Sequence, residues 1–397
     1  MSTKVTVTPK SEEDTLVLEF AGKIDSSNAP KLEEEIRQIT ADAAQSSLIL
    51  DFDRLKYTTS AGLRVILRLK QQFGNVEITN ASPEVYDILE MTGFTDMMPV
   101  QKAFRAISVE NCEVIGQGAN GKVYRIDRDT IVKVYLNADA LPEIRREREL
   151  ARAAFVAGVP TAIPYDVVKI DGGGFGSVFE LLNAESYAKL LAEGKKSLEE
   201  LAVMSVDLLK LIHSKTVKPG SMPNMKETAE NWVRFLKDYL PAGAHGKLTD
   251  MVAAVPDDLH MMHGDYHIKN VMLQNGESLL IDMDTLCYGY PVFEFASMYN
   301  AYCGFSELDH SAVERFLGIP RDLSVAFWKR SLELYLGTTD EKAVRDVEDK
   351  ARIIGYARMM RRSIRRNGLN TEEGRAVIEN CRSQLLELVD RVDSLTF

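Results

Sequence analysis

The chain has 397 residues, in which 48 Lys and Arg stand against 59 Asp and Glu, giving a formal net charge of -11. This length predicts two or three domains, and the acidic balance argues against a nucleic-acid partner, which would need a basic surface. No apolar stretch is long enough to span a bilayer or to act as a signal peptide, so we expect no membrane partner. The four cysteines lie far apart without a C-x-x-C pair, which predicts reduced thiols and a cytoplasmic location.

The first hundred residues alternate between strand and helix patterns. Segments with period-two alternation or a buried apolar run predict strands, and segments with apolar residues at helical spacing predict helices. Pro30 fits the first turn of the first helix. We therefore expect an α/β domain with a mixed sheet over residues 1–104. The expected strands are 3–8, 15–21, 47–52 and 76–79, and the helices begin near Asn28, at Ser60 and at Pro83.

A short connector, residues 101–108, leads into a second domain that we place at residues 109–397. Its first part, about residues 109–182, is rich in strand patterns with one charged helix over 141–156. From about residue 183 onward the pattern is almost wholly helical, interrupted by a strand-rich stretch over 260–284. This predicts an α+β domain with a small β-rich lobe and a larger helical lobe.

Ser60 falls at the junction between a buried strand and a helix. The unpaired amides and the dipole of a helix N-terminus would stabilise a phosphate added there. A serine at this place also serves as an ordinary helix cap. The spacing alone leaves both interpretations open.

Three segments of this first domain resemble the STAS domain of bacterial anti-sigma factor antagonists over about residues 3–100. They are Gly22-Lys-Ile-Asp25, the strand ending at Asp51, and Thr59-Ser60-Ala-Gly-Leu63. The resemblance implies a protein partner for this domain, a matching aspartate at Asp25, and Ser60 as the candidate phosphosite. Thr59 departs from the family, which usually has an aspartate directly before that serine.

A glycine-rich loop lies between the first two strand patterns of the second domain. Gly116, Gly118 and Gly121 form a G-x-G-x-x-G-x-V sequence followed by a strand rather than a helix, which favours a hairpin folded over nucleotide phosphates. Lys133, on the next strand, is suited to hold the α- and β-phosphates; a solvated lysine on an edge strand is the alternative. The helix that follows offers three glutamates as partners for this lysine: Glu143, Glu147 and Glu149.

The second cluster of polar residues follows at 263–284. Asp265 lies in a predicted tight loop and can accept a hydroxyl proton, Asn270 five residues later can bind a metal, and Asp282 at a strand end can bridge a metal to phosphates. Asp284 is an alternative to Asp282. A different interpretation is a metal cluster made of His260, His263 and His267, but no Cys or Glu completes it.

The sequence H-G-D-x-H-x-x-N followed by I-D-x-D resembles the aminoglycoside phosphotransferase and choline kinase branch of the protein-kinase-like fold, over about residues 109–397. The resemblance implies ATP and Mg²⁺ as cofactors. It favours Glu147 over the other two glutamates, and it places Glu294 where the family usually has an aspartate. The implied roles are Asp265 as catalytic base, Lys133 and Glu147 as the phosphate-binding pair, Gly116, Gly118 and Gly121 as the phosphate loop, the backbone of Glu180 to Leu182 against adenine, and Asn270 and Asp282 as magnesium ligands.

Together these features predict an ATP- and Mg²⁺-dependent phosphotransferase that acts on a hydroxyl of a small molecule and carries a regulatory STAS domain. One alternative is a protein kinase for a STAS-domain serine, for example Ser60; another is a nucleotide sensor without turnover. Only eight residues separate Asp282 from Pro291, which leaves little chain for the activation segment on which protein kinases dock peptides.

Two features bear on the acceptor. The net charge is compatible with a cationic acceptor but does not select one. A run of five arginines lies on a late helix, and it predicts mainly a solvated face, with a bound phosphorylated group or the N-terminal domain as alternatives. These arginines are Arg358, Arg361, Arg362, Arg365 and Arg366.

Overall fold

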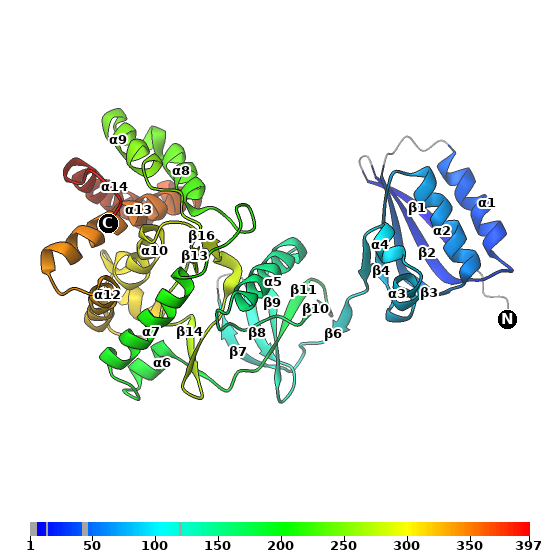
Figure 1. Ribbon diagram of the computed structural model, residues 1–397, viewed down its shortest axis with the longest axis horizontal. Helices are drawn as coiled ribbons and strands as arrows, with labels where there is room; N and C mark the ends of the chain where they lie inside the picture. The colour runs from blue at the N-terminus through cyan, green and yellow to red at the C-terminus, as the bar shows by residue number, and fades with distance from the viewer. Residues whose placement is uncertain (1–5, 13–14, 42–46, 119–120, 138) are drawn as a thin grey trace. The chain divides into compact units, whose positions relative to one another are not determined.

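The computed structural model describes residues 6–12, 15–41, 47–118, 121–137 and 139–397 (Figure 1). The chain forms two compact units, Met1–Ser108 with Val168–Asp171, and Val109–Val167 with Gly172–Phe397. Within the described ranges, no helix has the length and apolar character needed to cross a membrane. The start of the predicted strand at 3–8 and the tip of the glycine-rich loop at 119–120 lie outside these ranges.

The first unit is built on a five-stranded sheet in the order β1-β2-β3-β4-β5. β1 runs antiparallel to β2, and the other neighbouring strands are parallel. Alternate residues of β2 are buried, as the period-two pattern predicts, and they join a core drawn from residues 16–98. The predicted α/β class is confirmed. The elements are β1 (Thr6–Glu12), β2 (Thr15–Ile24), α1 (Ala29–Thr40), β3 (Ser47–Thr58), α2 (Ser60–Gln72), β4 (Asn75–Ala81), α3 (Pro83–Met91), α4 (Phe94–Met97) and β5 (Val100–Lys102).

The connector at 101–108 is not irregular, because it contains the end of β5 and a further strand, β6 (Arg105–Ile107), which pairs in parallel with β10 (Asp166–Ile170). The small lobe of the second unit follows it. Four antiparallel strands lie in the order β11-β9-β8-β7, and one helix, α5 (Leu141–Val156), follows β9. The strands are β7 (Glu113–Gln117), β8 (Gly121–Arg125), β9 (Thr130–Tyr135) and β11 (Phe175–Glu180).

The large lobe is helical, with two small ladders, β12-β14-β15 and β13-β16, at the predicted strand-rich stretch. This confirms the predicted two-lobed α+β arrangement. The helices are α6 (Tyr187–Ala192), α7 (Leu198–His213), α8 (Met225–Phe235), α9 (Ala242–Ala253), α10 (Val292–Tyr302), α11 (Ser311–Leu317), α12 (Arg321–Leu336), α13 (Glu341–Arg365) and α14 (Glu372–Arg391). The short strands are β12 (Glu185–Ser186), β13 (Met261–Met262), β14 (Val271–Gln274), β15 (Glu277–Leu280) and β16 (Cys287–Tyr288).

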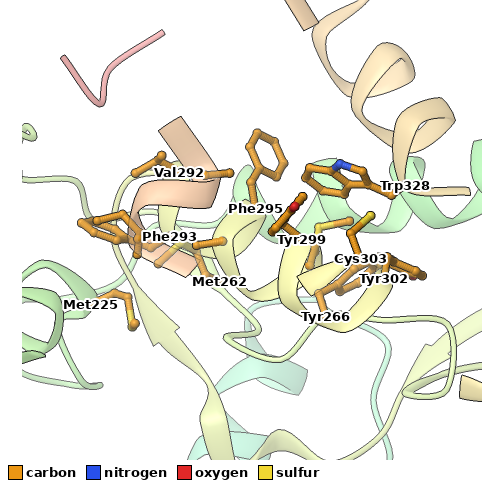
Figure 2. Packing of buried hydrophobic residues seen from close by; sticks show 14 of the residues in the cluster. Met225, Met262, Tyr266, Val292, Phe293, Phe295, Tyr299, Tyr302, Cys303 and Trp328 are labelled. Atoms are coloured by element: carbon orange, nitrogen blue, oxygen red, sulfur yellow. The ribbon is translucent and has the colours of Figure 1, made fainter. Parts of the chain in front are cut away.

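Helix α10 is the centre of this lobe, because every one of its residues is buried. A helix that is buried around its whole circumference lies in the core of a large lobe, and its few polar side chains need partners there. Figure 2 shows its aromatic residues packed together with residues of neighbouring elements; Phe295 and Tyr299 meet Trp328 edge-on, with ring centroids 6.3 and 6.1 Å apart. This core fixes α10, and α10 in turn holds the loop that carries Asp265.

Candidate active site

A cleft of about 1000 Å³ lies within the second unit. Its lining comes from the glycine-rich hairpin, β9, α5, the segment after β11, the loops at 265–270 and 281–285, and the helices α10, α11, α13 and α14. Residues that are more than 200 positions apart in the sequence therefore meet here. Every site residue predicted for the second domain, from Gly116 to Asp282, lines this cleft.

The glycine-rich hairpin is formed by β7 and β8. Gly116 lies at a shift in the strand register, and the amide of Gly118 donates to the carbonyl of Gly121 across the turn at 3.0 Å. A Cβ atom at Gly121 would lie 2.3 Å from the carbonyl oxygen of Val134, so a side chain there would push β8 away from β9. The hairpin thus brings backbone close to the cleft.

Lys133 reaches into the cleft from β9 and contacts two carboxylates. Its Nζ lies 3.0 and 3.2 Å from the two oxygens of Glu147 and 2.6 Å from Asp282 Oδ1. Burial alone would lower the pKa of Lys133, but the charges of Asp282 and Glu147 outweigh it and raise the pKa. The lysine is therefore charged and held in place, not solvated on an edge strand.

The structure distinguishes the three candidate glutamates. Glu147 is 3% exposed, whereas Glu143 and Glu149 point into solvent. Glu147 lies between Ile144 and Leu150 on the buried stripe of α5, a position that helical spacing normally gives to an apolar residue. A charged residue on the apolar stripe of a helix is a signal present in the sequence itself, and it distinguishes Glu147 from the other two glutamates without reference to any family.

Tyr135 is a site residue that the sequence analysis missed. Its hydroxyl donates to Glu147 and lies 3.3 Å from Ser177 Oγ. Burial raises the pKa of Tyr135 above the range of ordinary tyrosines, so it remains a neutral donor. It lies two residues after Lys133 on the same strand, a spacing that places both side chains on one face of the sheet.

The loop before Asp265 is held by a buried carboxylate. Gly264 has φ +80°, and a Cβ there would lie 2.4 Å from the carbonyl oxygen of Thr285. Glu294 of α10 accepts the amide of His263 at 2.6 Å and that of Gly264 at 3.0 Å. Glu294 is thus a structural residue, and its carboxylate satisfies two buried donors in the turn.

Asp265 lies just after this turn. His267 Nε2 is 3.6 Å from Asp265 Oδ2. Burial alone would raise the pKa of Asp265, but His267 and the charges of Arg358 and His263 lower it to about 2. The carboxylate is therefore ionised at neutral pH, which is the state in which it can accept a proton.

Asn270 and Asp282 are brought together by the β14-β15 hairpin, whose first pair is Val271 and Leu280. Beyond that pair the amide of Ile281 donates to the carbonyl of Asn270 at 3.0 Å. The Nδ2 of Asn270 donates to the carbonyl of Asp265 at 3.0 Å, which leaves its Oδ1 as the acceptor end. The two side chains predicted to bind magnesium therefore both lie at the open end of one hairpin.

The donors at this point fit a magnesium ion. Asp282 and Asn270 supply hard oxygen ligands, and Mg²⁺ typically takes only one or two protein ligands, with waters and phosphate oxygens completing its shell. Burial and the charge of Asp282 raise the pKa of Asp284 to about 7, and the charge of Lys133 only partly offsets this effect. A further cation would stabilise the two neighbouring carboxylates in their ionised form. In the part of the chain that the structure describes, no three His, Cys, Asp or Glu residues are grouped to hold a metal, and the alternative histidine cluster does not form.

The segment after β11 forms the back of the cleft. Glu180, the last residue of β11, lines it together with Leu181 and Leu182, and the amide of Leu181 donates to the carbonyl of Asp129 at 2.8 Å. The segment predicted to meet adenine therefore lies at the cleft, and the amide of Leu181 is already paired within the small lobe.

The arginine run does not form a uniformly solvated face. Arg358, Arg362 and Arg366 line the cleft, Arg361 lies over the ring of Phe235, and Arg365 is exposed outside it. Residues four apart share one face of a helix, so Arg358, Arg362 and Arg366 project on the same side. Arg362, Arg365 and Arg366 are exposed, as a solvated face requires, whereas Arg358 and Arg361 are half-buried. Because α13 packs against α10 and α14, the side that carries Arg358, Arg362 and Arg366 also lines the cleft.

In the first unit, Ser60 is exposed and is the first residue of α2, while Thr59 occupies the N-cap position without a side-chain capping bond. Asp25 accepts the amide of Ser27 at 2.8 Å and holds the turn before α1. Ser60 is thus not the cap itself. Its hydroxyl lies where the first unpaired amides of the helix are found.

Comparison with known proteins gives matches for both units. The model of the phosphotransferase enzyme family matches residues 111–324, and that of the STAS domain matches residues 6–107. The anti-sigma factor antagonist BtrV of Bordetella bronchiseptica is 34% identical over 95 residues, which cover 23% of this chain and 81% of that protein.

Solved structures show similarity at low identity. An ADP-bound aminoglycoside phosphotransferase is 15% identical with a TM-score of 0.46, covering 78% of this chain and 99% of that one. A choline/ethanolamine kinase family protein from Mesorhizobium loti is 16% identical with a TM-score of 0.44, covering 70% and 92%. An anti-sigma factor antagonist from Mycobacterium paratuberculosis is 21% identical with a TM-score of 0.24, covering 25% and 88%.

The family match spans the elements that carry the glycine-rich hairpin, Lys133, Asp265 and Asp282, and the STAS match spans the five-stranded sheet of the first unit. The chain therefore belongs to the phosphotransferase enzyme family and carries a STAS domain, similar to anti-sigma factor antagonists, in its amino-terminal part.

Proposed function

We propose that this protein transfers the γ-phosphoryl group of ATP to a hydroxyl group of a small molecule in a magnesium-dependent reaction, in the cytoplasm, and that its STAS domain binds a protein partner. The observation that supports the reaction is the convergence of one lysine, one ionised aspartate and two oxygen ligands on a single cleft. These are Lys133, Asp265, Asn270 and Asp282.

Each residue has a distinct task in this proposal. Asp265 accepts the proton of the acceptor hydroxyl as the hydroxyl oxygen attacks the γ-phosphorus, and the bond from that phosphorus to the bridging oxygen breaks to release ADP. Lys133, fixed by Glu147, binds the α- and β-phosphates. The glycine-rich hairpin covers the phosphates with backbone amides, and the backbone of Glu180 and Leu182 meets the adenine.

Asn270 and Asp282 would hold the magnesium ion, which neutralises charge on the phosphates. Asp282 has φ +64° and ψ +63°, a left-handed conformation that costs a non-glycine residue about 1–2 kcal/mol. A residue held in such a conformation directs its side chain differently from its neighbours. Here that direction brings the carboxylate to Lys133, where the phosphates of ATP would lie.

The test is the purified full-length chain and its Asp265→Asn variant, assayed for ADP release against a panel of hydroxyl compounds. The variant keeps the shape of the side chain but removes the base, so we expect turnover to fall by about 10²- to 10⁴-fold while the affinity for ATP changes little. Near-normal turnover in the variant would remove Asp265 from the chemistry. ATP binding without turnover on any acceptor would favour the nucleotide-sensor alternative.

A protein kinase acting on Ser60 is the second candidate, because that serine is exposed at a helix N-terminus. Between Asp282 and α10 the chain forms only the short helix Met283–Thr285 and β16, so no extended peptide platform is present in this described segment. Intact mass after incubation with Mg-ATP distinguishes the candidates. Near-complete addition of one phosphate to the parent chain, absent from Ser60→Ala, would favour the protein kinase.

A further inference from the structure

The cleft is divided by charge. Its lining carboxylates all belong to the catalytic loops, α5 and the end of β11. Among the described residues that line it from position 297 onward, three are arginines and none is Asp or Glu. We call this part, contributed by α10, α11, α13 and α14 with the loops between them, the acceptor end. It is cationic even though the chain as a whole is acidic.

The three arginines of the acceptor end are not held in ion pairs by neighbouring acids. Within the described ranges, Arg358, Arg362 and Arg366 form no ion pair with a carboxylate, whereas Arg330, also in this lobe, contacts two glutamates. Arg358 donates to the carbonyl of Gly264 at 3.2 Å and lies over the ring of Trp232. Arg362 lies over the ring of Phe305. These contacts orient the guanidinium groups, and the carboxylate of Asp265 is close enough for its charge to act on Arg358 and Arg362 without forming an ion pair with either.

The charges also act on one another. Partial burial lowers the pKa of Arg362, the charges of Arg366 and Arg358 lower it further, and the charge of Asp265 opposes them without reversing the direction. Placing like charges together in a cleft is unfavourable unless an anion binds between them, and the planar guanidinium fork matches phosphate and carboxylate groups. An anion at the acceptor end would therefore relieve a repulsion that is built into the protein.

The position of the arginines relative to Asp265 sets the size of the ligand. Arg358 contacts the residue before Asp265, Arg362 follows at about 6 Å along the helix axis from a rise of 1.5 Å per residue, and Arg366 comes directly after the last residue of α13. A compound that places a hydroxyl at Asp265 would reach these two arginines with an anionic group several bonds away. This is the size of a sugar phosphate or a sugar acid.

We propose that the acceptor is an anionic hydroxyl compound, whose phosphate or carboxylate group is bound by Arg362 and Arg366 while its hydroxyl meets Asp265. The inference rests on the proposed phosphotransferase function and names its substrate class. The net charge of the chain is compatible with a cationic acceptor, but this inference argues against one. The ligand contacts the side chains of the acceptor end, so their positive charge matters more than the negative charge of the whole chain.

The first experiment measures ADP release by the full-length chain with two series of compounds, each built on one carbon skeleton: glucose, glucosamine, gluconate and glucose 6-phosphate, and glycerol, glycerate and glycerol 3-phosphate. We expect turnover to be restricted to anionic members, and the two kinds of anion separate phosphate from carboxylate recognition. Arg362→Gln and Arg366→Gln should each raise KM for that acceptor by about 10- to 100-fold with KM for ATP unchanged. Arg362→Lys should recover part of the loss, and Arg365→Gln, a change of the same type outside the cleft, should have no effect.

The second experiment measures binding without turnover. Inorganic phosphate and gluconate are titrated calorimetrically into the full-length chain and the same variants, with thermal unfolding to show that each variant is folded. We expect binding to be lost in the Arg362→Gln, Arg366→Gln double variant and kept in Arg365→Gln. Equal binding to all three proteins overturns the inference, even where none of the seven compounds is an acceptor.

Other results would contradict the inference and leave the proposed function intact. Turnover of glucosamine or glucose at least as efficient as that of their anionic counterparts would do so. So would a rise in KM for ATP alone, which would assign the arginines to the nucleotide phosphates. Phosphate transferred only to the chain itself would also overturn it. Failure of the proposed phosphotransferase function would give a different result, namely no ATP turnover that depends on Asp265. In that case the binding experiment still tests whether Arg362 and Arg366 bind an anion.

Discussion

Replacing Glu294 by Gln tests whether a buried carboxylate positions the catalytic loop. Its side chain is fully buried and accepts the amides of His263 and Gly264, directly before Asp265. Gln has nearly the same shape but offers one oxygen and one NH₂ group. One backbone amide would then keep an uncharged acceptor, and the other would face a donor.

The size of the effect follows from the hydrogen bonds. A bond to a charged acceptor contributes about 1.5–3 kcal/mol, and a buried donor left without a partner costs a similar amount. We therefore expect Glu294→Gln to lower the free energy of unfolding by about 1.5–3 kcal/mol. For a domain of this size that corresponds to a fall in Tm of about 3–12 °C. Displacement of Asp265 should lower kcat by about 10- to 100-fold.

The measurements are thermal unfolding and ADP release, with Ser297→Ala as the matched control. Ser297, on the same helix, donates to the carbonyl of Gly264 at 2.9 Å, and it contributes one neutral bond of about 0.5–1.5 kcal/mol. The control should therefore be milder in both assays. A Glu294→Gln variant with the Tm and kcat of the parent, or one milder than Ser297→Ala, would refute the argument.

The pH dependence gives a second check on the same residue. Burial alone would raise the pKa of Glu294, but its contact with His213, the charges of His213 and His263, and the Gly264 amide lower it. A group whose pKa is lower in the folded state stabilises the fold at pH values above its unfolded pKa, about 4.3 for Glu, and loses that contribution as pH falls through the folded value. The difference in stability between parent and variant should be complete at pH 7 and shrink below about pH 4.

Two further predictions concern the metal site and the first unit. Asp282→Asn should raise the Mg²⁺ concentration needed for half-maximal rate and lower kcat, because it weakens an oxygen ligand and the contact with Lys133; a Mg²⁺ titration identical to that of the parent would remove Asp282 from the site. Residues 1–104 should fold alone, because their core is drawn from residues 16–98 and the sheet ends with β5; circular dichroism of this fragment should show a cooperative thermal transition, and a gradual loss of signal would contradict it.

Much of this protein is determined locally. The period-two pattern of β2, the run of β3 and the helical spacing of α1, α2 and α5 predict elements close to those observed, because amphipathic periodicity depends on neighbours in the sequence. The identity of the site residues is local too. Gly264 and Asp265 lie within one short loop motif that the sequence shows directly, although the conformation of this loop also depends on Glu294 of α10.

The contacts between distant elements were decided by tertiary structure. Lys133 and Asp282 are 149 positions apart, and only the folded chain places their charged atoms 2.6 Å from each other. Tyr135 is also a partner of Glu147, and the sequence gives no sign of this contact beyond the strand alternation that places Tyr135 on the same face as Lys133. The arginines show the same limit: helical spacing places Arg362 and Arg366 on one face, but the packing of α10 and α14 against α13 decides whether that face meets solvent or a cleft. Periodicity specifies which residues share a side, and the long-range packing of apolar surfaces specifies what that side contacts.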